Sequence, residues 1–278
     1  MQITAAMVKT LRERTGAGMM ECKKALVEAG GDIDLGADNL RKAGQAKADK
    51  KASRVAAEGT IAIVQEATKA LIIEVNCETD FVSSNQDYTD FAKTIAGLAL
   101  SADCDDPEAV LSLNAPDGVT VEEMRRNLIT AVGENVQIRR LNLVNSKGNH
   151  LGVYLHGGRI GVIVDIRGGD EELAKDIAMH IAASRPAALD ADHLPAEQLD
   201  KEREIIRAQV AASGKPPEIQ EKMIPGMVNK YLKEVTLLGQ AFVKQPDLSV
   251  AKHLEANGAE VLSYQRFEVG EGLAKDDD

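Results

Sequence analysis

One pattern occurs twice along this chain, and it limits the folds the chain can adopt: two apolar strands joined by a short turn, then an amphipathic helix. In chain order the members are strands 60–64 and 71–75 with helix 90–100, then strands 151–155 and 160–166 with helix 172–181. β-branched runs bounded by turn residues favour strands, and apolar residues at helical spacing favour helices. The repeat therefore predicts an α+β fold whose core is two related subdomains with mostly antiparallel strands.

The two copies differ in the connection between the second strand and the helix. When 71–76 is aligned on 162–167, both helices show the same Ala-Lys-x-Ile-Ala core, but the first connection has 14 residues (77–90) and the second has 5 (168–172). Loops longer than the connection requires are often functional. The excess contains Thr79, Asp80, Phe81 and Val82. The alternative is a neutral surface insertion with Phe81 packed back onto the core.

Composition narrows the class of partner. The chain has 278 residues, 44% of them hydrophobic but only 3% aromatic, with no Trp. Its net charge is -11, which argues against nucleic acid as the main partner, because phosphate binding needs a clustered positive field. A protein partner or a small ligand is favoured.

The cysteines and the chain start indicate a compartment. Cys22, Cys77 and Cys104 are odd in number and widely spaced, which predicts neither a disulfide framework nor a zinc site. No apolar run approaches the length of a membrane span, and the N-terminus is charged and amphipathic. We expect a cytoplasmic protein.

The domain organisation follows from helix signals outside the repeat. Helices starting near Thr4, Met19 and Asp32 predict an N-terminal three-helix module, followed by a charged segment, 47–54, that is a linker or an exposed helix. The predicted boundaries are 1–55 for the module with its linker, 56–143 for the first core subdomain, and 144–278 for the second.

A helical hairpin is predicted within the second subdomain. Two helical runs joined by a Gly-Lys-Pro-Pro turn form an insert at about 190–233, and Pro225 should kink or break its second arm. The acidic end at 275–278 is expected to be disordered.

The search for catalytic groups is mostly negative. The stretch 16–20, Gly-Ala-Gly-Met-Met, resembles part of a phosphate loop, but no strand precedes it and helix punctuation explains it better. His180 is expected to pack on an apolar helix face. His156, at a hairpin turn, is the most exposed histidine candidate, but no nucleophile or substrate pocket accompanies it. No catalytic residue is predicted, and we do not expect an enzyme.

The residues therefore favour a protein built for contact. An exposed Phe81 beside Asp80 is typical of a hot spot that enters a partner's pocket. Met19 and Met20 at a helix start offer a second apolar patch, unless they pack within the module. A basic patch for nucleic acid remains an alternative, as does an enzyme that uses the 16–20 turn. The basic residues concerned are Lys42, Lys47, Lys50, Lys51 and Arg54.

Several ordered blocks together resemble the bacterial elongation factor Ts family. They are Val8 to Leu26 (VKTLRERTGAGMMECKKAL), Thr79 to Val82 (TDFV), His156-Gly157, and Arg266 to Gly272 (RFEVGEG). The resemblance covers almost the whole chain. It implies a ubiquitin-associated-like N-terminal domain, a core of two related subdomains and a coiled-coil hairpin.

The resemblance also implies a function and a set of contact residues. The function is guanine-nucleotide exchange on the GTPase elongation factor Tu, with GDP release followed by GTP rebinding. Thr79 to Val82 would disturb the site that holds magnesium and phosphates in the partner's G domain. Lys9, Arg12, Met19 and Met20 would contact the same domain, and His156 would face the partner's third domain.

Overall fold

A computed structural model of the chain describes residues 3–273, apart from the side chains of residues 45–47 and 49, and divides them into two compact units. Among described residues, unit 1 comprises 3–144, 157–161 and 267–273, and unit 2 comprises 145–156 and 162–266. The α+β class is confirmed, whereas the predicted boundaries at 55 and 143 stay a prediction. The acidic end predicted at 275–278 lies outside the described residues.

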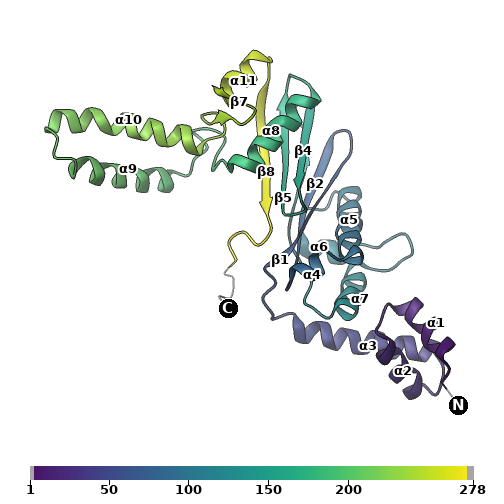
Figure 1. Cartoon of the computed structure of the whole chain (residues 1–278). Coiled ribbons are helices and arrows are strands. Elements are labelled where there is room, and N and C mark those ends of the chain that lie inside the picture. The colour runs from purple at the N-terminus through teal and green to yellow at the C-terminus, as the bar shows by residue number, and fades with distance from the viewer. Residues whose placement is uncertain (1–2, 274–278) are drawn as a thin grey trace. The chain divides into compact units, whose positions relative to one another are not determined.

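Unit 1 is built from helices and one three-stranded sheet (Figure 1). Its elements are α1 (Ala5–Thr15), α2 (Met19–Glu28), α3 (Ile33–Lys51), β1 (Glu58–Gln65), β2 (Lys69–Cys77), α4 (Asp80–Ser83), α5 (Gln86–Ser101), α6 (Pro107–Leu111), α7 (Val121–Val132) and β3 (Gln137–Asn145).

Unit 2 carries the second three-stranded sheet and the helical hairpin. Its elements are β4 (His150–His156), β5 (Ile160–Arg167), α8 (Glu171–Ser184), α9 (Ala196–Ala211), α10 (Pro217–Val235), β6 (Ala241–Phe242), β7 (Gln245–Ser249), α11 (Val250–Ala256) and β8 (Glu260–Glu268), with the ends of β5 and β8 belonging to unit 1.

The duplicated pattern is confirmed in both units. β1 and β2 form an antiparallel hairpin that pairs Ala62 with Ile73, the sheet order is β1-β2-β3, and α5 packs on the hairpin. The second sheet has the order β4-β5-β8, with α8 packed on β4. β2 and β5 are the central strands and are almost entirely buried, which explains why their sequences are mostly apolar and do not alternate with polar residues.

Each central strand carries one buried carboxylate at the same place in the repeat. Glu74 of β2 aligns with Asp165 of β5, and both are buried. Asp165 accepts hydrogen bonds from the Ser146 hydroxyl (2.8 Å) and from the backbone amides of Lys147 (2.8 Å) and Gly148 (3.2 Å). Buried carboxylates persist only when hydrogen-bonded or paired. In unit 2 this requirement fixes the turn between β3 and β4.

The three-helix module is confirmed, with one difference in length. The Thr4 hydroxyl caps α1 by accepting from the Met7 amide (3.3 Å), and Gly16 ends α1 with a φ of +68°. Val8 and Leu11 are buried in the core of the module. α3 continues to Lys51, so most of the charged segment predicted at 47–54 is its last turns.

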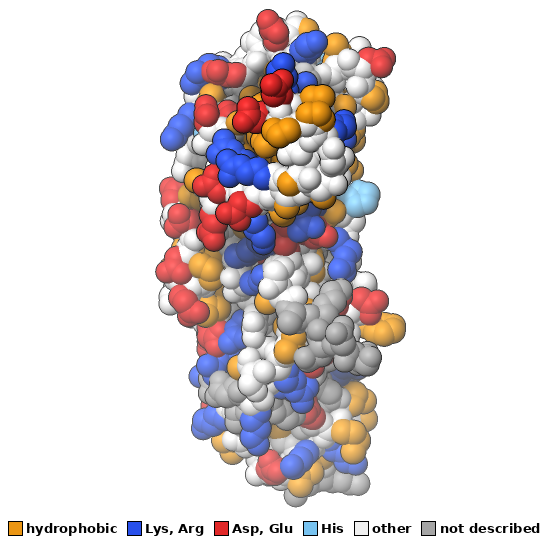
Figure 2. Space-filling view, turned by 90° about the vertical axis from the view of Figure 1, so that its left-hand side faces the viewer, with side chains coloured by type: hydrophobic (Ala, Val, Ile, Leu, Met, Phe, Trp, Pro, Cys, Tyr) orange, Lys and Arg blue, Asp and Glu red, His pale blue; other side chains and the backbone are white. Residues whose placement is uncertain are grey.

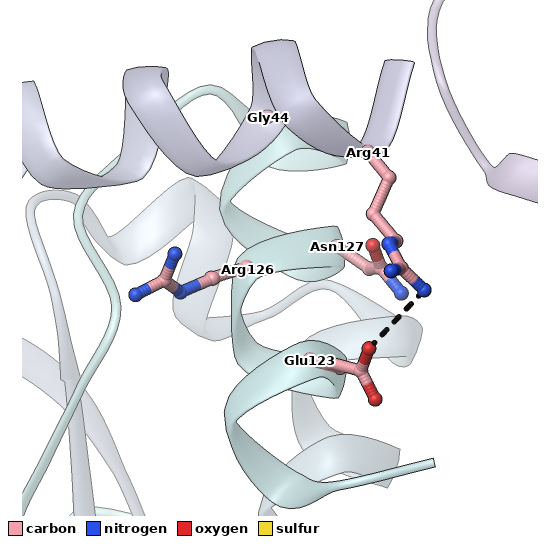
Figure 3. A pocket seen from close by; sticks show the side chains of 5 residues that line it. All are labelled: Arg41, Gly44, Glu123, Arg126 and Asn127. Carbon is pink, nitrogen blue, oxygen red and sulfur yellow. Dashed lines mark ion pairs between the residues drawn. The ribbon is translucent and has the colours of Figure 1, made fainter. Parts of the chain in front are cut away.

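α3 packs against α7 in unit 1 at a position where a side chain would not fit. A Cβ added to Gly44 would lie 2.6 Å from Thr130 Oγ1. Beside this contact, Arg41 forms an ion pair with Glu123 (3.4 Å; Figure 3). The glycine therefore permits a close approach of the two helices.

The helical hairpin is confirmed, but its second arm is unbroken. α9 and α10 run side by side (Figure 1). α10 continues through Pro225, so the predicted break is wrong, whereas a kink there stays a prediction. Pro225 and Gly226 are exposed, and a carbonyl that loses its helical partner on the exposed face can accept a hydrogen bond from water. The short elements α6, β6 and β7 were not predicted.

Candidate functional site

The connection between β2 and α5 presents an exposed aromatic side chain. Residues 78–85 join the two elements, against 168–170 in the second copy, and the longer loop contains the one-turn helix α4. Phe81 is 86% exposed, and Val82 is only 8% exposed. The alternative in which Phe81 packs back on the core is therefore wrong. Asp80 is also exposed, so an acidic and an aromatic side chain stand together at the tip.

Glu134, between α7 and β3, holds the start of this loop. Its Oε2 accepts hydrogen bonds from the backbone amides of Glu78 (3.1 Å) and Thr79 (3.0 Å), and its Oε1 accepts from the Thr79 hydroxyl (2.6 Å). In return, the Asn135 amide donates to Glu78 Oε1 (2.7 Å). Arg54 adds an ion pair with Glu78 (3.3 Å). Each segment therefore provides a carboxylate to the backbone of the other.

The inner side of the loop rests on the core of unit 1. The Cys77 thiol donates to the Thr79 carbonyl (3.1 Å), and the Tyr88 hydroxyl donates to the Val75 carbonyl (2.7 Å). Burial raises the pKa of Cys77 to about 11, and burial also raises the pKa of Tyr88 well above its usual value. Both groups stay protonated at neutral pH, so they act here as hydrogen-bond donors.

The predicted contact residues of the module are exposed. Lys9 and Arg12 lie on α1, and Lys9 pairs with Glu13 at 3.7 Å. Met19 and Met20 open α2 and are 52% and 75% exposed. The alternative in which both methionines pack inside the module is therefore wrong, and these side chains are available for contact.

His156 ends β4 in unit 2 and is exposed, as predicted. Its Nδ1 lies 3.3 Å from the Tyr154 hydroxyl, and the two rings are stacked with centroids 6.3 Å apart. The predicted contact residues thus fall into three groups: the loop of Thr79, Asp80, Phe81 and Val82, the exposed side chains of the module, and His156 in the other unit.

A family model described as "Elongation factor TS" matches residues 78–271. The chain is also 56% identical over 278 residues to the elongation factor Ts of Thioalkalivibrio sulfidiphilus. The aligned region covers 99% of this chain and 94% of that protein. The chain belongs to the elongation factor Ts family. Two further members, from Methylococcus capsulatus and Alcanivorax borkumensis, are 51% and 52% identical to this chain. Their aligned regions cover 100% and 98% of this chain, and 95% of each of those proteins. As a member of this family the chain is a translation elongation factor.

The rival phosphate-loop interpretation of residues 16–20 is not supported in this family member. Gly16 ends α1, and Gly18 is the N-cap of α2, so both glycines separate two helices and follow no strand. Among residues 3–273, no group of His, Cys, Asp or Glu side chains has the arrangement of a metal site.

Two of the five basic residues in and after α3 form contacts within unit 1. Lys51 donates to the Gly133 carbonyl, and Arg54 pairs with Glu78. The side chain of Lys47 lies outside the described residues. On the face drawn in Figure 2, basic and acidic side chains are mixed and do not gather by sign. This distribution does not favour a nucleic-acid surface.

A small pocket lies beside the contact between α3 and α7. The pocket lined by Arg41, Gly44, Glu123, Arg126 and Asn127 (Figure 3) has about 10 Å³ of space, room for about one water molecule.

In the part of the chain that the structure describes, no helix is both long and apolar enough to span a membrane.

No sequence pattern singled out Glu134. It lies 56 positions from Glu78 and belongs to no periodic pattern or motif. The one local signal is the position of Glu134 directly after Gly133, which ends α7 with a φ of +82°. That signal predicts a helix end and says nothing about a distant partner.

Proposed function

We propose that this chain is the guanine-nucleotide exchange factor of the GTPase elongation factor Tu. It binds that protein, promotes GDP release and allows GTP to bind in its place. The observation that carries the proposal is the exposed Phe81, with 86% of its surface accessible, on a loop held at both flanks in a chain of the elongation factor Ts family.

The loop supplies a wedge and a charge. Phe81 enters an apolar pocket of the partner's G domain, since buried aromatic anchors contribute most of the binding energy at interfaces. Thr79 and Val82 fix the ends of the wedge, and Asp80 brings a negative charge towards the site of magnesium and phosphates. Magnesium neutralises phosphate charge in such GTPases, so disturbing its site weakens the grip on GDP.

Exchange follows from linkage and needs no covalent step. Bound nucleotide lowers the partner's affinity for this protein, and by linkage this protein lowers the partner's affinity for nucleotide to the same extent. Incoming GTP then displaces the factor. The protein is accordingly an exchange factor, not an enzyme that makes or breaks bonds, and it requires no cofactor.

Further contacts extend the interface. Met19 and Met20 provide adaptable apolar surface against the G domain, and Lys9 and Arg12 provide positive charge beside it. His156, at the end of β4, meets the third domain of the partner. The exposure of all five side chains supports these roles.

The test is the release of a fluorescent GDP analogue from elongation factor Tu. The unmodified protein should accelerate release, and the Asp80→Ala/Phe81→Ala double variant should lose roughly thirtyfold or more of that acceleration, as expected for one or more hot-spot residues. A matched control is Asp105→Ala/Val55→Ala, which removes an exposed acid and an exposed apolar side chain elsewhere in unit 1. It should behave like the parent.

Two results would contradict the proposal. No acceleration by the unmodified protein would remove the exchange function. Full acceleration by the double variant would leave exchange in place but remove the loop from the mechanism.

A further inference from the structure

The helix that carries Asp80 and Phe81 is too short to hold its own shape. α4 has four residues, and an isolated helix of one turn is unstable in water because the first turn fixes several dihedral angles for a single hydrogen bond. The position of the exposed pair must therefore be set by contacts outside α4.

Thr79, the N-cap residue of α4, does not stabilise that helix through its side chain. Its backbone has the extended conformation of an N-cap (φ -128°, ψ 158°), but its hydroxyl makes no capping hydrogen bond. The hydroxyl donates instead to Glu134 Oε1. The residue that would normally cap the helix is thus used to attach the loop to Glu134.

Glu134 makes the most concentrated attachment of the loop. One carboxylate accepts three hydrogen bonds of 2.6 to 3.1 Å, two of them from consecutive backbone amides at the entry to α4. Hydrogen bonds to an ionised acceptor are about twice as strong as neutral ones. The carboxylate therefore fixes the direction in which the chain leaves β2.

The other end of the loop is fixed by packing. Val82 belongs to the apolar core of unit 1, and the Thr79 carbonyl accepts from Cys77. Between these anchors only Asp80 and Phe81 are exposed, whereas Thr79 is half-buried. The contacts at both ends thus present just the two side chains that the proposed function uses.

We propose that Glu134 is a positioning residue for nucleotide exchange: it holds the 78–79 backbone so that Asp80 and Phe81 are already in place when the partner arrives. This inference rests on the proposed exchange function. A wedge ordered in advance loses less conformational freedom on binding than one that must be ordered at the interface, and a supporting contact of this kind keeps functional side chains within a fraction of an ångström of their working positions.

Loss of the Glu134 carboxylate should slow nucleotide exchange strongly, and only because Asp80 and Phe81 are no longer held in place. Glu134→Ala removes all three hydrogen bonds, and we expect exchange at subsaturating factor to slow by about tenfold to a hundredfold, the range for hydrogen bonds to a charged group. In the Asp80→Ala/Phe81→Ala background the same substitution should have almost no further effect, because there is no wedge left to position.

A conservative variant separates geometry from charge. The amide of Glu134→Gln can accept from the two backbone amides through its oxygen and donate to the Thr79 hydroxyl through its nitrogen. It should therefore recover most of the exchange rate lost in Glu134→Ala. Glu108→Gln, an exposed glutamate on α6, removes the same charge as a control and should match the parent.

The experiment measures fluorescent GDP release from elongation factor Tu over a range of factor concentrations for all these variants. Amide hydrogen exchange of residues 78–84 in the free protein is measured in parallel. We expect Glu134→Ala to speed hydrogen exchange at Glu78 and Thr79, and Glu134→Gln to do so much less.

Each outcome decides one question. Equal slowing by Glu134→Ala in both backgrounds, unchanged GDP release, or Glu134→Gln as slow as Glu134→Ala would overturn the positioning role. If the parent itself fails to accelerate GDP release, the proposed function falls. The positioning of the loop by Glu134 is then judged by hydrogen exchange alone, and unchanged protection at residues 78 and 79 would overturn it.

Discussion

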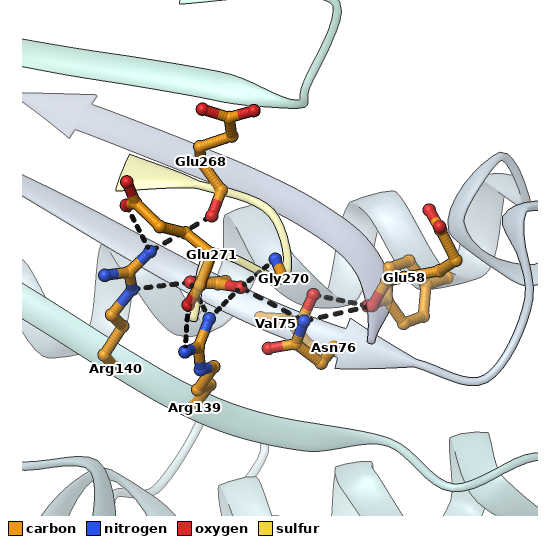
Figure 4. Close-up of polar contacts among 10 residues, drawn as sticks. Glu58, Val75, Asn76, Arg139, Arg140, Glu268, Gly270 and Glu271 are labelled. Carbon is orange, nitrogen blue, oxygen red and sulfur yellow. Dashed lines mark hydrogen bonds and ion pairs between the residues drawn. The ribbon is translucent and has the colours of Figure 1, made fainter. Parts of the chain in front are cut away.

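Replacing Glu74 by glutamine should destabilise unit 1. The carboxylate is completely buried and accepts hydrogen bonds from the Gly270 amide (2.8 Å), from Asn76 (3.1 Å), and from the guanidinium groups of Arg139 (3.0 Å) and Arg140 (2.6 Å). Figure 4 labels these four donor residues. These donors lie on β2, on β3 and in the segment that follows β8. One side chain thus joins three parts of unit 1.

The expected loss of stability follows from the guanidinium charges that lose their carboxylate partner. Removing one partner of a buried ion pair costs about 3–5 kcal/mol, mostly because the other charge stays behind. Arg139 and Arg140 are 22% and 30% exposed in their side chains, so water reaches them, and Arg140 also donates to the Glu268 carbonyl (3.1 Å). We therefore expect the lower end of the range, about 3 kcal/mol.

The assay is urea unfolding followed by pulsed hydrogen exchange and mass spectrometry, because it separates the two units. With a slope of about 1–3 kcal/mol per molar urea, the midpoint reported by the peptide 69–77 should fall by about 1–3 M, while a peptide from 171–184 in unit 2 serves as an internal reference. Glu66→Gln, an exposed carboxylate 3.8 Å from Lys69, is the matched control and should change stability by less than about 0.5 kcal/mol.

The pH dependence gives a second check. Burial alone would raise the pKa of Glu74, but the Gly270 amide and the two guanidinium groups outweigh it and hold the pKa below the ordinary value of 4.5. The stabilisation by the ionised Glu74 carboxylate is then fully present above the ordinary pKa. It is lost as the pH falls through the lower pKa of the folded state. The difference between parent and Glu74→Gln should therefore shrink in acid. A loss of unfolding free energy below about 0.5 kcal/mol at neutral pH, or an equal midpoint shift in both units, would refute the reasoning.

The remaining predictions concern the thiols and the contact between α3 and α7. Because burial raises the pKa of Cys77 to about 11, iodoacetamide at pH 8 should alkylate Cys77 more slowly than the half-buried Cys104, as peptide mass spectrometry can measure; equal rates would contradict this. Gly44→Ala should cost about 1–3 kcal/mol by forcing α3 away from Thr130. Thr130→Ala in the same chain should recover most of that loss in thermal or urea unfolding, and a Gly44→Ala protein as stable as the parent would show that the helices can separate freely.

Local patterns predicted most of the fold. The hairpin and helix of each copy appear where the apolar periodicity placed them. The differences arise where tertiary context overrides local preference. Pro225 does not end α10, because it lies on an exposed side of the helix. The short strands β6 and β7 pair with one another over too few residues to leave a periodic signal.

The candidate site was predicted from the lengths of the strand-to-helix connections in the two copies, not from a chemical motif. The longer connection in the first copy contains Phe81, and the exposure of that side chain agrees with the prediction. Glu134 could not be found in the same way. Its role depends on a contact across 55 or more residues of sequence, and long-range pairs leave no trace in the spacing of neighbouring residues.

By itself, the amino-acid sequence determined the class of the fold, the duplicated subdomains, the three-helix module and the loop that carries Asp80 and Phe81. Helix caps, strand alternation and repeat spacing act over a few neighbouring residues, so a linear sequence displays them directly. Only the tertiary structure decided that Phe81 faces outward, that Glu134 attaches the loop, and that Glu74 joins β2 to β3 and the C-terminal segment. Exposure and buried ion pairing depend on which distant segments come together, and that depends on the packing of the whole unit.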